Sequence, residues 1–271
     1  MHKIDTFVFL LSIQLGKKKP LILVTNDDSI NAAGIKVLIN TMCEIGDVVV
    51  VAPDSPQSGM GHAITLDSPL RLKEIKATGH KEYICSGTPV DCVKLAVNVV
   101  LQRKPDLLVS GINHGSNASI NVIYSGTMSA AVEGALEGIP AIGFSLLDYA
   151  QDADFSVVQK YVKIIAQNAL DKGMPRRTCI NVNFPSIPEE QLKGVRVCRQ
   201  ANGNWQEEFD VREDPTGKKY YWLTGVFVNY DKGKDTDEWA LANGYVSIVP
   251  VQYDLTAHHA VPFLNEWSYE I

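Results

Sequence analysis

Two adjacent carboxylates open the first polar turn of this 271-residue chain. Asp27 and Asp28 follow Leu21 to Val24, an unbroken apolar run of the kind that forms buried parallel strands. Neighbouring carboxylates repel each other, so a chain that holds both at one strand end must offset their charge with a cation, a base or water. Oxygen ligands of this kind suit Mg²⁺, Mn²⁺ or Ca²⁺. Taken alone, the pair is more often an Asx turn that begins the next helix.

Two further loops supply neutral oxygen atoms. Residues 53–61, PDSPQSGMG, follow the next apolar run and contain the hydroxyl of Ser58. Residues 110–124, SGINHGSNASINVIY, follow a third apolar run and contain the carboxamide of Asn113. Because ligands bind beyond the carboxyl ends of strands in a parallel sheet, we expect both side chains to join the two carboxylates around one divalent cation.

The same region contains a predicted anion site. Ser125-Gly126-Thr127 begins a helix rich in small residues, and the free N–H groups of a helix start, together with two hydroxyls, can hold a phosphate. Asn117 lies in the preceding loop, and we assign its carboxamide to the same phosphate-binding set. A cation beside a phosphate and a water molecule is equipped for hydrolysis, because it offsets transition-state charge and lowers the pKa of the water.

Hydrophobic periodicity predicts the elements that position these loops. Apolar runs and helical stripes alternate along the chain, which predicts an α/β fold with a doubly wound, mostly parallel sheet. A capping box at Thr88-Pro89-Val90-Asp91 begins one of the helices. The helix expected over 154–171 has its core stripe at Val157, Val158, Tyr161, Ile164 and Ile165. The strands are expected at 21–24, 47–52, 83–85, 107–109, 141–145 and 179–184, with helices at 34–44, 88–102 and 125–137 and an antiparallel excursion at 64–75.

The chain from residue 194 onward has a different sequence pattern, in which expected strands predominate over helices. Strands are expected at 195–197, 220–228 and 245–251, with a polar connection over 202–217 and a short helix over 236–242. All four tryptophans fall in this last third, where large apolar faces complete the core or meet another subunit. We therefore expect one α/β domain over residues 20–271, with the β-rich segment 195–271 used in oligomer contacts.

Composition excludes several classes of function. The net charge of -6 and a pI near 5.5 argue against binding to a nucleic acid duplex, which needs a basic face. The five cysteines are odd in number and form no CxxC pair, which indicates reduced thiols in the cytoplasm. We interpret residues 1–19 as an N-terminal extension, since its apolar run is too short to span a membrane and has no cleavage site.

Seven segments, in order, resemble the SurE family of metal-dependent nucleotidases, the stationary-phase survival proteins. They are NDDSINAAG, PDSPQSGM, SGTPVDCV, SGINHGSN, YSGTMSAAVEG, INVNFP and GYVSIVP, and the resemblance spans residues 21–257. It implies a 5′/3′-nucleotidase that hydrolyses nucleoside monophosphates with one divalent ion, Mg²⁺ or Mn²⁺, per subunit. The family's metal ligands correspond to Asp27, Asp28, Ser58 and Asn113. The resemblance also implies a Rossmann-like core and a homodimer or homotetramer in which C-terminal segments cross between subunits.

The chain departs from the family pattern in a few loop positions. Ser29 and Ser119 stand where the family usually has glycine, Asn121 stands where Asp is common, and Ser55-Pro56 replace a more polar pair. None of these positions is a proposed ligand. Ser29 and Pro56 are expected to affect loop conformation.

Two other functions fit parts of the pattern. An aspartyl-phosphate phosphatase also places Asp at the first strand end, but it needs Asp-x-Asp, and the residue two after Asp27 is Ser29. We therefore favour direct attack by water, assisted by Asp27 or Asp28, over a covalent intermediate. A nucleotide-binding or assembly module without turnover is the alternative from another class, although the chain lacks both GxGxxG and GxxxxGK[ST]. The histidines, His114 included, are assigned no catalysis.

Overall fold

We describe a computed structural model that covers residues 19–150 and 152–269. Its main sheet consists of nine strands in the spatial order β3-β4-β2-β1-β5-β6-β7-β11-β8. Only the β3–β4 and β7–β11 pairs are antiparallel. The strands are β1 (Leu21–Thr25), β2 (Asp47–Pro53), β3 (Leu72–Ile75), β4 (Lys81–Cys85), β5 (Leu107–His114), β6 (Ala141–Leu146), β7 (Thr178–Phe184), β8 (Val195–Val197) and β11 (Val246–Gln252). The predicted mostly parallel α/β sheet is thus confirmed.

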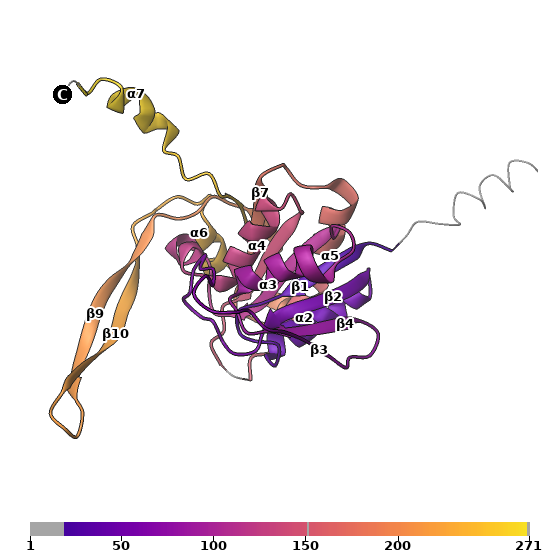
Figure 1. Ribbon diagram of the computed structural model, residues 1–271. Helices are drawn as coiled ribbons and strands as arrows, with labels where there is room; N and C mark the ends of the chain where they lie inside the picture. The colour runs from indigo at the N-terminus through magenta and orange to yellow at the C-terminus, as the bar shows by residue number, and fades with distance from the viewer. Residues whose placement is uncertain (1–18, 151, 270–271) are drawn as a thin grey trace, which may run out of the picture.

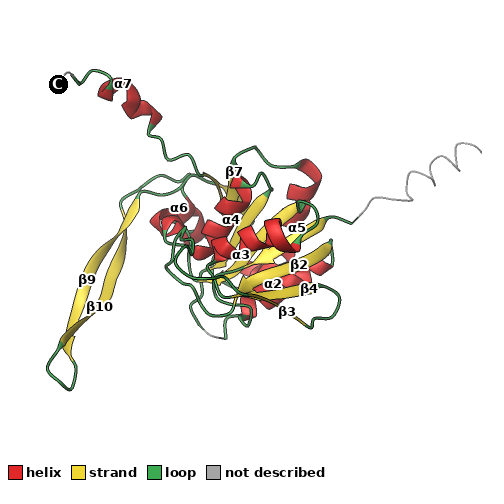
Figure 2. Cartoon of the chain, viewed as in Figure 1, coloured by secondary structure: helices red, strands yellow, loops and turns green. Residues whose placement is uncertain are grey.

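Helices cover both faces of this sheet (Figures 1 and 2). The helices are α2 (Ala33–Cys43), α3 (Pro89–Leu95), α4 (Gly126–Leu136) and α5 (Ser156–Lys172). In β1, Ile22 and Val24 pack in one core with α2 and α5, whereas Leu23 packs in a second core with α3 and α4. Successive strand residues point to opposite faces, so a continuous apolar run supplies both cores.

The strand order reverses beside β1. From β1 the chain continues to β2 and β4 on one side, and the next parallel strand, β5, pairs with the free side of β1. Such a reversal leaves a crevice beyond the carboxyl ends of the two central strands, and ligands of doubly wound sheets bind there. The loops after β1, β2 and β5 all leave the sheet at this edge.

Local sequence explains where the helices begin. The hydroxyl of Thr88 accepts a hydrogen bond from the N–H of Asp91, whose carboxylate accepts one from the N–H of Thr88, so the predicted capping box is present. The hydroxyl of Ser125 caps α4 by accepting from the N–H of Met128 at 3.0 Å. After α3 the chain continues as a π-helical segment, η1 (Ala96–Val100), so helical structure nearly reaches the predicted end.

Three predictions about the elements were wrong: one strand end, one segment without regular structure and one member of a helix's buried stripe. β5 continues to His114 because its pairing with β6 resumes, after a register shift, at Asn113 opposite Ser145. Residues 203–213 form a strand, β9 (Gly203–Glu213), rather than a polar connection, because they pair along their whole length with β10 (Lys219–Asn229). In α5, Ile164 is exposed and Val162 takes its place in the core.

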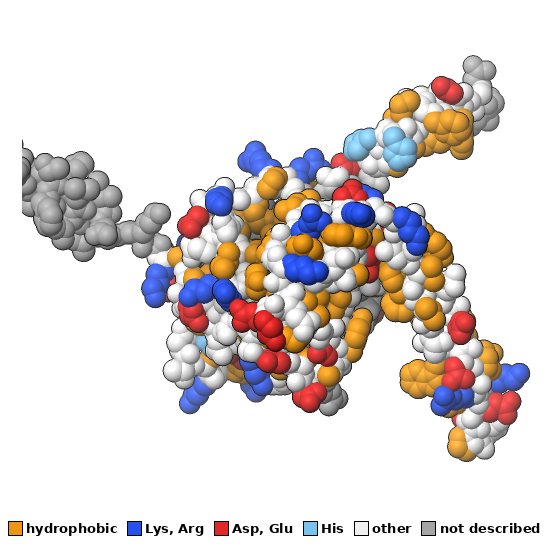
Figure 3. Space-filling view, turned by 180° about the vertical axis from the view of Figure 1, so that it is seen from behind, with side chains coloured by type: hydrophobic (Ala, Val, Ile, Leu, Met, Phe, Trp, Pro, Cys, Tyr) orange, Lys and Arg blue, Asp and Glu red, His pale blue; other side chains and the backbone are white. Residues whose placement is uncertain are grey.

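The β9–β10 hairpin and the C-terminal segment project away from the sheet (Figures 1 and 2). The hairpin returns through α6 (Asp237–Ala242), and the C-terminal segment ends in η4 (His258–Ala260) and α7 (Val261–Leu264). Apolar side chains lie in the open on both projections (Figure 3). The short helix predicted over 236–242 is confirmed, with Thr236 as its cap.

The extension assigned to residues 1–19 lies outside the described residues except for Lys19. In residues 19–150 and 152–269, none of the helices combines the length and the apolar character that crossing a bilayer requires.

Candidate active site

Backbone hydrogen bonds join the loops that follow β1, β2 and β5. The N–H of Gln57 donates to the carbonyl oxygen of Asp27 at 2.7 Å, which fixes the second loop over the first. The N–H of Gly61 donates to the carbonyl oxygen of Tyr124 at 3.2 Å, which fixes the second loop against the third. The three segments that the sequence singled out therefore meet at one edge of the sheet.

The carboxylate of Asp27 lies directly against the start of α4. The hydroxyl of Thr127 donates a hydrogen bond to Asp27 Oδ1, and Asp27 is almost fully buried. A Cβ added at Gly126 would lie 2.7 Å from Asp27 Cβ and 2.9 Å from Oδ2, too close for any real side chain. Glycine at this position lets the positive end of the helix approach the carboxylate.

Burial raises the pKa of both carboxylates, and repulsion from Asp28 adds to the shift of Asp27. Burial, followed by the charge of Asp28, raises the pKa of Asp27 from 3.8 to about 6 despite the hydrogen bond from Thr127. Burial also raises the pKa of Asp28, although the N–H of His114 opposes the shift. Two adjacent carboxylates that are costly to ionise are the electrostatic arrangement that a bound divalent cation would relieve.

Asp28 connects the first loop to Asn113. The N–H of His114, the next residue, donates to Asp28 Oδ2 at 3.3 Å. The side-chain N–H₂ of Asn113 donates to the carbonyl oxygen of Gly115 at 3.0 Å, so the carbonyl oxygen of that amide is the atom left for a cation. The ring of His114 packs edge-on against Phe155, with 4.8 Å between the ring centres.

Ser58 lies on the exposed part of the second loop. It directly follows Gln57, whose backbone N–H donates to the carbonyl oxygen of Asp27, so this contact brings the loop segment that contains Ser58 to the acidic turn. A hydroxyl and an amide oxygen beside two carboxylates form an all-oxygen set, which fits Mg²⁺ or Mn²⁺. The described residues contain no group of three or more His, Cys, Asp or Glu that could hold a metal, so a cation at this edge would need neutral oxygens as further ligands.

Glu133 fastens the Ser58 loop to two helices. This nearly buried side chain of α4 forms ion pairs with His62 at 3.0 Å and with Lys94 of α3 at 2.6 Å. Burial alone would raise the pKa of Glu133, but the bonds from His62 and Lys94 outweigh it and lower the pKa. The contact of Glu133 with His62 thus anchors the loop four residues beyond Ser58.

Asn117 and Ser125 already have partners within the protein. The side chain of Asn117 donates to Ser145 Oγ at 2.7 Å, and its backbone N–H donates to Asn183 Oδ1 at 2.9 Å. The hydroxyl of Ser125 is the acceptor of the α4 cap. In this arrangement Asn117 positions the third loop, and its assignment to phosphate binding stays a prediction, as does that of Ser125, Gly126 and Thr127.

Sequence reasoning anticipated the special backbone of one residue of the first turn, Ser29, and missed the role of another, Asn26. Asn26 is buried, its N–H₂ donates to the carbonyl oxygen of Ser29 at 2.7 Å, and its Oδ1 has no hydrogen-bond partner within the described chain. Ser29 has a left-handed backbone with φ of 82°. The glycine that the family usually has at position 29 already indicated an unusual backbone there. Nothing in the sequence distinguishes Asn26 from an ordinary turn residue.

Two cavities lie at the other edge of the sheet. One of about 620 Å³ is lined by residues at the amino ends of β1, β2 and β4, and one of about 450 Å³ by residues that precede β6 and β7. Neither contains the two carboxylates or the start of α4. We place the site by its polar groups and by the reversal of strand order, because these carry the chemistry.

The fold and the acidic edge define an α/β protein of the class that binds ligands where the strand order of a doubly wound sheet reverses. The chain belongs to the SurE family: the model of the family described as Survival protein SurE matches residues 22–207.

Curated relatives and a solved structure cover nearly all of the chain. A 5′-nucleotidase SurE of Flavobacterium psychrophilum is 67% identical over 92% of this chain and 98% of its own length. A 5′-nucleotidase SurE of Bacteroides fragilis is 50% identical over 94% of this chain and 100% of its own. The crystal structure of the SurE protein from Aquifex aeolicus has a TM-score of 0.79 and 39% identity, covering 91% of this chain and 100% of that one.

Proposed function

We propose that this chain is a divalent-cation-dependent 5′-nucleotidase, a phosphoric monoester hydrolase that converts nucleoside monophosphates to nucleoside and phosphate. The observation that carries the proposal is the pair of neighbouring carboxylates at the reversal of strand order: Asp27, which is buried against the start of α4, and Asp28, which is half-buried beside it. The names of the curated relatives, 5′-nucleotidase SurE, support the same reaction.

The metal-binding residues in this proposal are Asp27, Asp28, Ser58 and Asn113. A bound Mg²⁺ or Mn²⁺, one per subunit, would offset charge on the phosphoryl oxygens and lower the pKa of a water molecule. The carboxylates supply the negative charge that selects a cation, and the two neutral oxygens complete the ligand set without further repulsion.

The start of α4 holds the phosphate in this proposal. The dipole of the helix and the N–H groups of its first turn favour an anion, and the hydroxyl of Thr127 links the same turn to Asp27. A water molecule attacks the phosphorus atom and Asp27 or Asp28 accepts its proton; the ester bond to the nucleoside breaks, and the leaving nucleoside oxygen takes up a proton to become a hydroxyl. Direct attack needs no second Asp two residues along, where this chain has Ser29.

We also propose a homodimer or homotetramer. Cross-strand partners of a hairpin lie on the same face. The pairing of β9 with β10 therefore gathers a set of apolar side chains on one face of the hairpin. Its members are Trp205, Phe209, Val211, Tyr221, Leu223 and Phe227. The C-terminal segment exposes a second apolar set, Val261, Phe263, Leu264, Trp267 and Tyr269. Exposed apolar surface on two projecting segments is typical of chains that exchange segments with a second copy.

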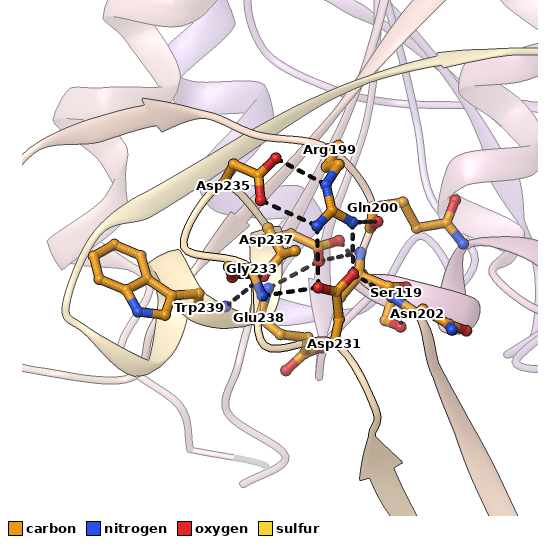
Figure 4. A network of polar contacts seen from close by, with 12 residues as sticks. Ser119, Arg199, Gln200, Asn202, Asp231, Gly233, Asp235, Asp237, Glu238 and Trp239 are labelled. Carbon is orange, nitrogen blue, oxygen red and sulfur yellow. Dashed lines mark hydrogen bonds and ion pairs between the residues drawn. The ribbon is translucent and has the colours of Figure 1, made fainter.

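A polar network fixes the base of the hairpin (Figure 4). The guanidinium of Arg199 pairs with the carboxylates of Asp231 and Asp235. Asp237 accepts hydrogen bonds from the N–H groups of Ser119 at 2.8 Å and Ala201 at 2.9 Å. Because Ser119 belongs to the loop after β5, the projecting hairpin is connected directly to the proposed site.

We assign the enzyme to the cytoplasm, since its five cysteines are odd in number, form no CxxC pair and are free in the structure.

Phosphate release tests the proposed reaction. Purine and pyrimidine nucleoside monophosphates are supplied with Mg²⁺ or Mn²⁺, and parallel samples contain a chelator. We expect release with either ion and none with chelator. A module that binds nucleotides without turnover would release none under any condition, and turnover that persists in chelator would contradict the dependence on a cation.

A further inference from the structure

Tyr149 is an exposed aromatic residue that the protein fixes in place beside the proposed site. It lies in the loop after β6, and 73% of its surface is exposed. Its ring packs over Gly115: a Cβ added there would lie 2.2 Å from Cε1, 2.8 Å from Cζ and 2.9 Å from Cδ1. The hydroxyl of Tyr149 also accepts a long hydrogen bond, 3.4 Å, from the N–H of Ser116.

The loop on which Tyr149 lies is itself anchored. Asp148, its neighbour, accepts hydrogen bonds from the N–H of Ala150 at 2.9 Å and from the hydroxyl of Ser186 at 3.1 Å. The N–H of Asp148 donates to the carbonyl oxygen of Leu146 at 2.7 Å. An exposed tyrosine would ordinarily sample several rotamers, but here the backbone and the ring are both held.

Gly115 connects the ring to the proposed metal ligands. Its carbonyl oxygen accepts from the side chain of Asn113 at 3.0 Å, and its N–H donates to Leu146 at 2.8 Å. The backbone of the next residue towards the site, His114, bonds the carboxylate of Asp28. Contacts of three consecutive residues, His114, Gly115 and Ser116, thus connect Tyr149 to Asp28 and Asn113.

We propose that Tyr149 is the stacking platform for the base of the nucleotide substrate, an inference that rests on the proposed function and extends it to substrate recognition. A purine or pyrimidine presents a flat π-face, and stacking on an aromatic ring contributes to binding without selecting hydrogen-bond patterns. A ring that is already fixed loses little entropy when the base binds. Purines bury more area on the ring than pyrimidines, so AMP binds more tightly than UMP.

Two substrates separate the base from the rest of the nucleotide. AMP and ribose 5-phosphate present the same phosphate and sugar, and only AMP has a base. For the wild-type enzyme with Mn²⁺ we expect a lower KM for AMP. The replacement Tyr149→Ala should raise the KM for AMP by about fivefold or more and leave kcat nearly unchanged. Fivefold corresponds to the lower end of the binding energy that one stacked base contributes. The KM for ribose 5-phosphate should not change, and Tyr149→Phe should behave as the wild type.

The matched control is Tyr124→Ala, which removes another exposed tyrosine next to the start of α4. Equal effects of Tyr149→Ala on both substrates, a loss confined to Tyr124→Ala, or a change in elution volume with Tyr149→Ala would each overturn the inference. If the wild-type enzyme hydrolyses both substrates with the same KM, the platform is rejected while the hydrolase stands. Failure to hydrolyse either substrate would instead reject the proposed function, and with it the platform.

Discussion

The acidic edge of the sheet and the β9–β10 hairpin depart in opposite ways from the usual distribution of side chains in a folded protein. The edge withdraws carboxylates from water, whereas the hairpin exposes apolar side chains to it. At the edge, Asp27 and Asp28 are neighbouring carboxylates that are partly or fully withdrawn from water, and burial raises the pKa of each. On the hairpin, side chains such as Phe209 and Leu223 are 60% and 62% exposed. In the proposed function a cation would relieve the first anomaly and a second copy of the chain would cover the second. The following changes test whether the two anomalies have these separate causes.

The largest effect is expected from Asp28→Asn. The amide oxygen of Asn can still accept from the N–H of His114, so the fold should be retained while one negative charge of the cation site is lost. Phosphate release from AMP should fall by more than about 100-fold, the upper value seen for residues that merely support metal ligands. Asp54→Asn is the matched control, since it removes a neighbouring exposed carboxylate. Near-normal rates for Asp28→Asn, with unchanged metal demand, would refute the site.

The hairpin is tested by placing a charge on its apolar face. Leu223→Asp should shift the protein to a smaller species in size-exclusion chromatography, because the carboxylate would be buried against the partner without a counter-charge. Thr224→Asp places the same charge on the opposite face of the same strand and should leave the elution volume unchanged. Truncation after Asp254 should also give a smaller species. If all three proteins elute with the wild type, neither projection holds subunits together.

Glu238 is a carboxylate whose pKa is raised by burial but which is not a proposed metal ligand, so it tests the effect of burial apart from metal binding. Burial, followed by the charge of Asp237, raises its pKa from 4.5 to about 7. A carboxyl group whose pKa is higher in the folded than in the unfolded state contributes stability below its unfolded pKa. That contribution is lost as the pH rises through the pKa of the folded state. Glu238→Gln should therefore stabilise the protein by about 1 to 2 kcal/mol at pH 8 and by less at pH 5, with or without Mn²⁺. Urea unfolding at both pH values measures this. Glu207→Gln, which changes an exposed carboxylate, should have no such effect, and a gain larger at pH 5 would contradict the assignment.

The smallest effect concerns the first turn. Ser29 has a left-handed backbone, which costs about 1 to 2 kcal/mol for a residue with a Cβ, and glycine relieves this at an entropic cost of about 0.5 to 1 kcal/mol. Ser29→Gly should raise the free energy of unfolding by up to about 1 kcal/mol. The control Ser55→Gly, at an exposed loop residue without this backbone, should lower it slightly. Destabilisation by Ser29→Gly would show that the side chain matters more than the strain.

Continuous apolar runs and cap signals made most of the sheet predictable. β1 and β2 are buried on both faces, so their sequences lack alternation, and the α3 capping box depends on residues only three apart. β9 was missed because it has no core to face. Its glutamates and aspartate are solvent-exposed, and only pairing with β10 makes it a strand. Ile164 was misplaced because the periodicity of a helix does not define the width of its buried stripe.

The candidate site also has features that the sequence predicted and features that it did not. Sequence alone indicated which loops meet, because strand ends of a parallel sheet share an edge, and the contacts of Gln57 and His114 confirm that they meet. Contacts that depend on three-dimensional detail were invisible: the approach of Gly126 to Asp27 and the bond from Asn117 to Ser145 join residues distant in the chain. Of the departures from the family, Ser119 and Asn121 both contact the hairpin base, through Ala201 and Trp205.

Direct titration with Mn²⁺, followed by electron paramagnetic resonance of the free ion, tests the central claim that three loops together hold one divalent cation. The wild-type chain should bind one ion per subunit in a saturable manner. Asp28→Asn should weaken that binding at least tenfold, and Asp54→Asn should not. Absence of saturable binding by the wild type, or equal affinity in the wild type and Asp28→Asn, would contradict the claim.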